Sequence, residues 1–310
     1  MATWTLAQSP ETEAPPMSSP NPEHSSARTI PELRRYKAGD GRPPLVMVTA
    51  YDAPTARFAV EAGVDILLVG DSVGTTLLGY DSTVPVTIDD ILHHTRAVRR
   101  GVPGAHIVAD LPFMTYQVSD EQAVANAGRL LKEGGADAVK LEGGLALASR
   151  VEAIARAGIP VVGHIGLTPQ TAGLLGGFKV QGQEFVSARV LIDDAIAVAR
   201  AGAYMLVIEV VPSALTGLIT ERVPIPVIGI GAGAGCDGQV LVMHDLLGIE
   251  DRHAARFVKR YATLAADIRA AVTAFASDVR DGAYPQPEHT YKMKPSVLAE
   301  LRDSLEREPS

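Results

Sequence analysis

The sequence predicts an α/β protein folded as one (βα)8 TIM barrel, a closed ring of eight parallel strands. Two observations lead to this prediction. Short runs rich in Val and Ile alternate with helical segments, which indicates a parallel sheet with right-handed crossovers. Roughly 255 residues remain between two polar ends, and ~250 is the usual barrel size. The alternative, an open doubly wound sheet, usually has a Gly-rich loop after its first strand, where this chain has TAYDAP.

Seven strands are predicted from apolar runs of strand length, and helices from the Ala-rich amphipathic segments between them. An eighth strand is expected around residues 239–243, although the same letters also suit a helix. Several helical segments end in Gly, as helices commonly do. The strands are residues 45–50, 65–70, 106–111, 137–142, 159–164, 204–209 and 225–230, and the helical segments include 53–63, 88–101, 119–135 and 193–202.

Both ends of the chain are predicted to lie outside the barrel. Residues 1–27 are rich in Pro, Ser, Thr and Glu and show no helical or strand period, which is typical of a disordered tail. They contain neither the apolar core of a signal peptide nor a basic transit sequence. Residues 28–284 are expected to form the catalytic barrel, and residues 285–310 a C-terminal extension.

Composition excludes several functional classes. The net charge of -8, from 36 acidic and 28 basic residues, argues against a nucleic-acid partner. The longest apolar runs are far shorter than the ~20 residues that cross a bilayer, so no membrane partner is expected. Cys236 is the single cysteine of the sequence, which fits a reducing cytoplasm. A catalytic thiol is disfavoured because no base is evident beside it.

Acidic residues stand at the ends of four predicted strands, where a barrel carries its catalytic groups. Asp71 follows LLVG, Asp110 ends HIVAD, Glu142 ends AVKLE and Glu209 ends MLVIE. The first three belong to consecutive strands, so they are expected to lean toward one point. Oxygen ligands of this kind suit Mg²⁺, with Mn²⁺ possible. A zinc site is not indicated, because His164 has no second histidine at ligand spacing.

Each of these residues also has a structural explanation. Asp71 could cap a helix, and Asp110, before Leu-Pro, could be a turn residue. Lys140 shares one face of its strand with Glu142 and could be no more than its ion-pair partner. Glu209 has no cation near it in the sequence, so it is the acid with the weakest structural explanation.

Two longer motifs are open to two interpretations each. The segment GIGAGAGCDG, residues 229–238, could bind a phosphate through its backbone N–H groups, or its glycines could allow close packing at the barrel mouth. The stretch from residue 163 to residue 183 shows no clear helix until Ser187, and long loops of this kind are often lids or substrate walls.

A set of motifs resembles a known family. In order, the chain contains TAYD, VGDSVG, DSTVPVT, HHTRAVRRG, ADLPFMTY, VKLEGG, GHIGLTPQ, GGFKVQG, VPVIGIGAG and DGQVLVMHDLLG. From about Tyr36 to His289 this resembles ketopantoate hydroxymethyltransferase, a family of the phosphoenolpyruvate/pyruvate barrel superfamily. The resemblance implies transfer of a hydroxymethyl group from 5,10-methylenetetrahydrofolate to 3-methyl-2-oxobutanoate. The product would be 2-dehydropantoate, for pantothenate and coenzyme A biosynthesis.

The same resemblance implies roles for individual residues, one Mg²⁺ per subunit and a homo-oligomer, usually a decamer. Glu209 matches the proton acceptor that forms a Mg-stabilised enolate. The chain departs from the family pattern after GGFKVQG, where Gln183 and Glu184 replace the common Arg-Gly. This bears on contacts with the folate or a neighbouring subunit, and not on the metal. The matching metal positions are Asp71, Asp110 and Glu142, and the matching keto-acid positions are Asp71, Ser72, Asp110 and Lys140.

Three other functions are compatible with the residues alone. A related Mg-dependent lyase or mutase that breaks C–C or P–C bonds of 2-oxo acids would use similar carboxylates. A phosphate- or flavin-binding barrel would rely on GIGAG. A non-catalytic binding barrel would keep the fold and have no need of Glu209.

Overall fold

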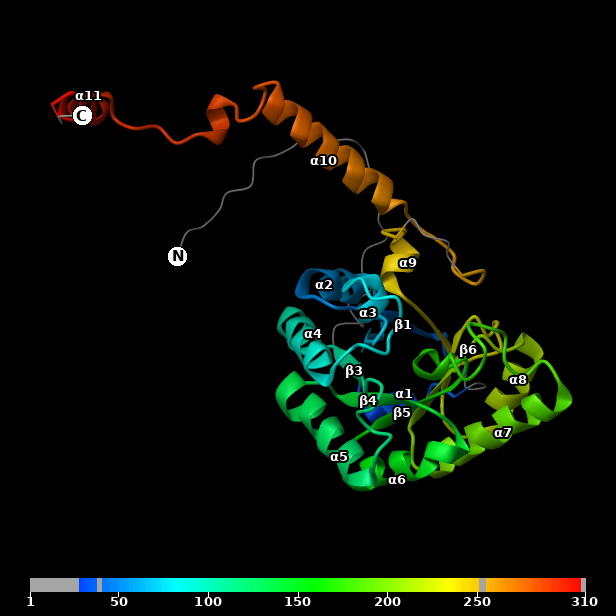
Figure 1. Cartoon of the computed structure of the whole chain (residues 1–310). Helices are drawn as coiled ribbons and strands as arrows, with labels where there is room; N and C mark the ends of the chain where they lie inside the picture. The colour runs from blue at the N-terminus through cyan, green and yellow to red at the C-terminus, as the bar shows by residue number, and fades with distance from the viewer. Residues whose placement is uncertain (1–27, 38–40, 251–254, 308–310) are drawn as a thin grey trace. The chain divides into compact units, whose positions relative to one another are not determined.

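The structure is a computed structural model that describes residues 28–37, 41–250 and 255–307 of the chain. Its centre is a closed barrel of eight parallel strands, each paired with the next in chain order and the last with the first. This confirms the predicted fold (Figure 1). The predicted disordered tail, residues 1–27, lies outside the described residues. The strands are β1 (Leu45–Thr49), β2 (Ile66–Val69), β3 (His106–Asp110), β4 (Ala138–Glu142), β5 (Val161–Gly166), β6 (Met205–Glu209), β7 (Val227–Ile230) and β8 (Gly238–Leu241).

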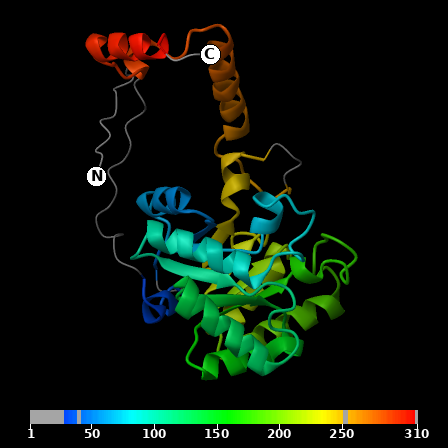
Figure 2. The same cartoon turned by 60° about the vertical axis from the view of Figure 1, so that its left-hand side comes forward.

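Helices cover the outside of the barrel (Figure 2). The predicted helix at 88–101 is α4, whose bounds agree with the prediction. It starts at a capping box between Thr87 and Asp90 and ends with Arg99 and Arg100, which suit the helix dipole. The eighth strand region forms both predicted alternatives in turn, since β8 is followed by α9 (Met243–Leu247). The other helices of the barrel are α2 (Ala53–Glu61), α3 (Val73–Thr76), α5 (Asp120–Arg129), α6 (Ala148–Arg156), α7 (Phe185–Arg200) and α8 (Ser213–Arg222), and α5 continues as the π-helix Leu130–Gly134.

The end of the barrel where the strands begin is filled by apolar side chains. The short helix α1 (Ile30–Arg34) contributes Leu33, which is fully buried in one core cluster with Leu45, Ile66 and Met205. These three residues stand at or next to the first position of their strands. Because this end is packed and apolar, polar groups at the opposite ends of the strands are the ones that face an open space.

The crossover from β7 to β8, residues 231–237, contains no helix. Its glycines permit close approach. Gly231 has φ +63°, and a Cβ there would lie 2.7 Å from the Phe257 ring. Gly233 has φ +82°, and a Cβ there would lie 2.1 Å from the Ser213 hydroxyl. Both positions therefore require glycine, which supports close packing as the reason for this Gly-rich segment.

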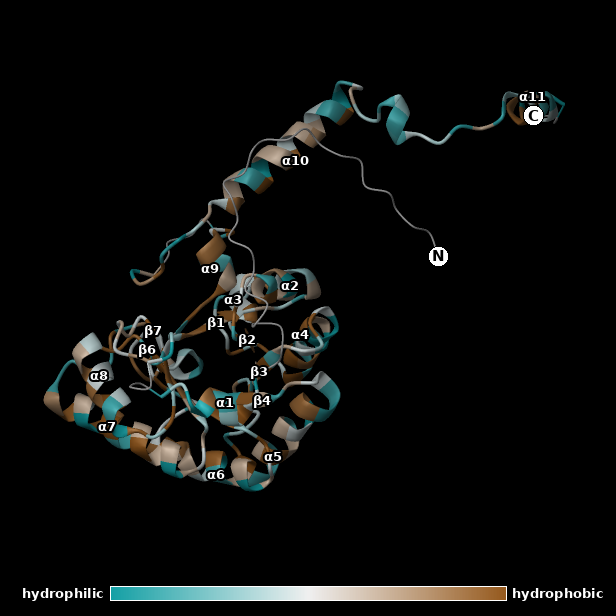
Figure 3. Cartoon of the chain, turned by 180° about the vertical axis from the view of Figure 1, so that it is seen from behind, coloured by the Kyte–Doolittle hydropathy of each residue, from teal (hydrophilic) through white to brown (hydrophobic). Residues whose placement is uncertain are grey.

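The chain divides into two compact units. Among the described residues, the first unit is the barrel, residues 28–37, 41–246 and 255–259, and the second comprises residues 247–250 and 260–307. The second unit contains α10 (Leu264–Arg280) and α11 (Pro295–Leu305). Hydrophilic and hydrophobic residues are interspersed along the length of α10 (Figure 3). The domain boundaries drawn from the sequence, at residues 27 and 284, stay a prediction. In the described ranges, no helix is both long and apolar enough to cross a membrane.

Candidate active site

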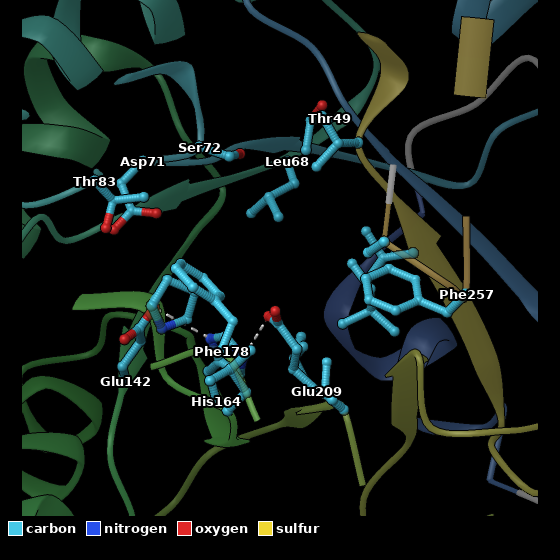
Figure 4. Close-up of a pocket in the computed structure, with 18 of the residues that line it drawn as sticks. Thr49, Leu68, Asp71, Ser72, Thr83, Glu142, His164, Phe178, Glu209 and Phe257 are labelled. Carbon is cyan, nitrogen blue, oxygen red and sulfur yellow. Dashed lines mark ion pairs between the residues drawn. The ribbon is translucent and has the colours of Figure 1, made fainter. Parts of the chain in front are cut away.

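A cavity of about 530 Å³ opens at the carboxyl ends of the strands, a usual size for a small-molecule site. Its floor is polar, and its wall includes Phe178 and Phe257 (Figure 4). The structure brings all the sequence-predicted site residues to this one cavity. They are Asp71, Ser72, Asp110, Lys140, Glu142 and Glu209.

Strand register explains why these residues meet. Asp110 is the register partner of Lys140 across β3 and β4, and Glu142 is the partner of His164 across β4 and β5. Glu209 pairs with Gly166 at the ends of β5 and β6. Side chains along a strand alternate between its two faces, so Lys140 and Glu142 share a face, and they line the same cavity.

Lys140 forms its ion pair with Asp110 on the neighbouring strand, with Nζ and Oδ1 3.2 Å apart. The sequence alone allowed Lys140 to be only an ion-pair partner of Glu142. In the structure its ion pair is with Asp110 instead. Both side chains are buried. Burial opposes the charge on Lys140, yet the carboxylates of Asp110, Glu142 and Asp71 outweigh it and raise the pKa of Lys140. Lys140 is thus a fixed cation at neutral pH.

Asp71 does not cap a helix. The residue before α3 is Ser72, whose side chain makes no capping bond and instead contacts the Tyr51 hydroxyl at 2.8 Å. The Asp71 carboxylate accepts a hydrogen bond from Gln170, and its backbone N–H donates to Asp110 Oδ2 at 3.0 Å. Burial, followed by the charges of Asp110 and Glu142, raises the pKa of Asp71 well above its usual range. Such a cluster is stabilised by an added cation.

His164 connects two acids of the cavity. Its Nε2 lies 3.2 Å from Glu209 Oε2, and its Nδ1 lies 3.5 Å from Glu142 Oε1. Its Nδ1 also lies 3.3 Å from Lys140 Nζ. Burial and the Lys140 charge oppose protonation, but the contacts with Glu142 and Glu209 outweigh them and raise the pKa of His164 to about 9. Glu209, which had no cation near it in the sequence, therefore has one in the fold.

The charges of the cavity suit a divalent cation. Its lining includes three basic side chains, those of Lys140, His164 and Arg256, and five carboxylates, those of Asp71, Asp110, Glu142, Glu209 and Asp245. Burial raises the pKa of both Asp71 and Asp110, so an added cation would favour their ionised forms. Asp110 Oδ1 is buried, and Lys140 Nζ is its ion-pair partner. In the described chain, no three acidic, His or Cys side chains have the spacing of a metal site. The donors themselves fit Mg²⁺.

Sequence reasoning missed several residues of this site. His164 and Gln170 stand inside the motif GHIGLTPQ, but their partners lie on other strands and are far away in the sequence. The buried Thr83 hydroxyl lines the cavity and has no hydrogen-bond partner in the described part of the chain. A single histidine within the apolar run VVGHIG was the one local signal. Cys236 is absent from the cavity lining, and burial raises the pKa of its thiol to about 11, which supports the view that it is not a nucleophile.

Comparisons with known proteins agree with the motifs. Residues 27–287 match the family described as ketopantoate hydroxymethyltransferase. The chain is 52% identical over 273 residues to a 3-methyl-2-oxobutanoate hydroxymethyltransferase of Carboxydothermus hydrogenoformans, covering 88% of this chain and 98% of the relative. It is 50% identical over 267 residues to the Bacillus subtilis enzyme of the same name, covering 86% and 96%.

Solved structures share the fold at low sequence identity. A phosphoenolpyruvate phosphomutase from Streptomyces platensis subsp. rosaceus superposes with a TM-score of 0.55 at 19% identity, covering 90% of this chain and 99% of that one. A 2,3-dimethylmalate lyase superposes with a TM-score of 0.53 at 16% identity, covering 89% and 96%. At these identities the likeness concerns the barrel alone.

Proposed function

The chain belongs to the ketopantoate hydroxymethyltransferase family, and from this we infer that it is a 3-methyl-2-oxobutanoate hydroxymethyltransferase of pantothenate biosynthesis. The one-carbon donor would be 5,10-methylenetetrahydrofolate. One observation carries the proposed chemistry. Glu209 and Asp71 both line one cavity (Figure 4), and Asp110 and Lys140 belong to the same lining. A base and a charged floor that can hold an anion therefore share one space.

The proposed mechanism uses fixed groups of the chain. Lys140 would bind the carboxylate of the keto acid as a point charge, and Ser72 would donate from its hydroxyl. Glu209 would take the proton from C3 of the substrate. The electron pair left at C3 would then form the new C–C bond to the methylene carbon of the folate. Both C–N bonds of that carbon would break, water would supply the hydroxyl oxygen, and tetrahydrofolate would leave. Because Lys140 and His164 are already in place before substrate binds, no rearrangement is needed when charge develops.

Asp71, Asp110 and Glu142 are the residues that we propose hold one Mg²⁺, in part through water. The burial of these three carboxylates in one cavity supports this assignment, because an added cation would stabilise their ionised forms. When bound, the ion would polarise the keto carbonyl of the substrate and so ease removal of the C3 proton. These residues supply oxygen donors, which Mg²⁺ prefers.

We also propose a homo-oligomer, a decamer by family resemblance, in the cytoplasm. Apolar side chains that stay exposed on the second unit support assembly. On α10 they include Val272, which is 61% exposed, and Phe275, which is 55% exposed. Apolar surface of this kind commonly marks an interface.

A folate-free assay tests the role of Glu209. With Mg²⁺ in D₂O, the chain should exchange the C3 hydrogen of 3-methyl-2-oxobutanoate, as followed by proton NMR. Glu209→Gln should slow this exchange by about 100-fold or more, since a general base contributes at least that much. Glu221→Gln, an exposed position on α8, is the matched control and should exchange normally. Undiminished exchange in Glu209→Gln would remove Glu209 from this role.

A further inference from the structure

We propose that Gln170 is a positioning residue that orients the carboxylates of Asp71 and Glu142 for binding of a divalent cation. The inference rests on the proposed function, because it concerns the same metal site. Gln170 follows β5 in a short 3-10 turn (Pro169–Thr171) and is 4% exposed. Within the described residues, Gln170 alone donates hydrogen bonds to both carboxylates.

The contacts of Gln170 reach across the cavity floor. Its Nε2 donates to Asp71 Oδ2 at 2.8 Å and to the carbonyl of Leu111 at 3.0 Å. Its backbone N–H donates to Glu142 Oε2 at 3.0 Å. One residue therefore fixes one oxygen of each acid, although Glu142 ends β4 and Asp71 lies two residues beyond the end of β2. The remaining oxygen of each carboxylate is left for other partners.

The orientation of the amide is determined by its neighbours. Oε1 accepts from the Tyr116 hydroxyl at 2.7 Å and faces Gln117 Nε2 at 3.4 Å. The Tyr116 oxygen in turn accepts from the Glu142 backbone N–H at 3.2 Å. A reversed amide would place its oxygen against a carboxylate and a carbonyl, both acceptors. The amide hydrogens must therefore point at Asp71 and Leu111.

A neutral amide suits this position better than a charged group would. A Lys or Arg side chain at this place would neutralise the acids and compete with a metal cation for their oxygens. An amide donor orients an ionised carboxylate and leaves its charge in place. This is the behaviour of outer-shell partners that orient metal ligands, whose loss typically costs about 10- to 100-fold in metal affinity.

Calorimetric titration of the substrate-free chain with Mg²⁺ tests the proposal. Gln170→Met keeps an unbranched side chain of similar length and removes the amide. It should bind Mg²⁺ about 10- to 100-fold more weakly than the parent chain. Glu142→Ala should lose most of the binding. Gln239→Met, the same replacement on the exposed side of β8, is the matched control and should bind like the parent.

Tyr116→Phe provides a second route if Gln170→Met does not fold. It removes the hydroxyl that donates to the amide oxygen and that also contacts the Glu142 backbone. The amide itself stays, so Mg²⁺ binding should weaken less than in Gln170→Met. Melting curves in EDTA separate a purely structural role, which would lower the melting temperature and leave Mg²⁺ affinity unchanged.

Two results would overturn the proposal, and they can be told apart. Parent-like Mg²⁺ affinity in folded Gln170→Met would show that the amide does not position the acids, while the metal site stands. If the parent chain itself does not bind Mg²⁺, the metal assignment is wrong and the role of Gln170 fails with it.

Discussion

At the residue scale, the histidine between two acids is the group most sensitive to pH. The native pKa of His164 is about 9, above the ordinary 6.5 of an unfolded chain. Its proton therefore stabilises the folded state fully below about pH 6.5, and this stabilisation is lost as the pH rises through about 9. His164 Nε2 lies 3.2 Å from Glu209 Oε2, so the charge of the protonated ring attracts the proposed base.

We expect His164→Gln to flatten the pH dependence of stability in the metal-free chain. The free energy of unfolding of the parent should fall between pH 6.5 and pH 9 by on the order of 3 kcal/mol from this group, as measured by urea unfolding in EDTA. His93→Gln, on the exposed face of α4, should keep the parent slope. An equal slope in all three proteins would mean that His164 is not protonated at neutral pH.

Single residues were predictable where their own strand provided the signal. The four strand-end acids were found because each follows an apolar run, and all four line the cavity. Gln170 and His164 were missed because their importance comes from partners such as Asp71, 99 positions away from Gln170. A glutamine after a proline has the appearance of an ordinary loop residue until the barrel closes.

At the element scale, the junction between β5 and β6 is packed so tightly that it admits only glycine. Gly166 ends β5 with φ +93°, and a Cβ there would lie 2.3 Å from the Glu209 carbonyl oxygen. Val210, the residue after Glu209, has φ +50°, an unusual value for a β-branched side chain. Its N–H donates to the Ile230 carbonyl at 2.8 Å. The backbone around Glu209 is therefore held from both sides.

We expect Gly166→Ala to destabilise the fold and displace Glu209. Gly158 provides a matched control because it has φ +83° with no atom within 4 Å of the added Cβ. Gly158→Ala should cost about 1–2 kcal/mol for the left-handed backbone. Gly166→Ala should cost about 1–3 kcal/mol more, the usual penalty of overpacking, with slower hydrogen exchange of the keto acid. Equal urea midpoints for the two variants would contradict this.

Elements were predictable where a periodic pattern is long, and less so at their ends. The bounds of α4 agree with the prediction, whereas α7 begins at Phe185, two residues before the expected Ser187. The absence of a helix between β7 and β8 could not be predicted. The glycines of this segment suit a phosphate-binding loop and a closely packed loop equally well. Phe257, which lies over Gly231, comes from a segment more than 20 residues later.

At the scale of the whole molecule, the second unit has apolar side chains that it does not bury. Ile268, Val272, Phe275 and Val279 recur at helical spacing on one side of α10 and are 49%, 61%, 55% and 48% exposed. The barrel has its own core. We therefore attribute this stripe to contacts between copies of the chain in the proposed oligomer.

We expect Val272→Glu to reduce the assembled mass measured by light scattering. A charge placed in an apolar interface is costly unless it is paired. Ala270→Glu adds the same charge about 200° around the helix, at an exposed position, and should leave the mass unchanged. If both variants keep the parent mass, α10 is not part of the interface.

The strand register described above also determines where the chain can change its length without losing the site. Asp110 with Lys140, and Glu142 with His164, are matched position by position across three strands. Because side chains alternate, removing one residue from the middle of β4 would send Lys140 or Glu142 to the opposite face. Insertions and deletions are therefore compatible with the loops beyond the strand ends, and not with the strands themselves. The geometry of the site therefore depends on strand register to the precision of a single residue.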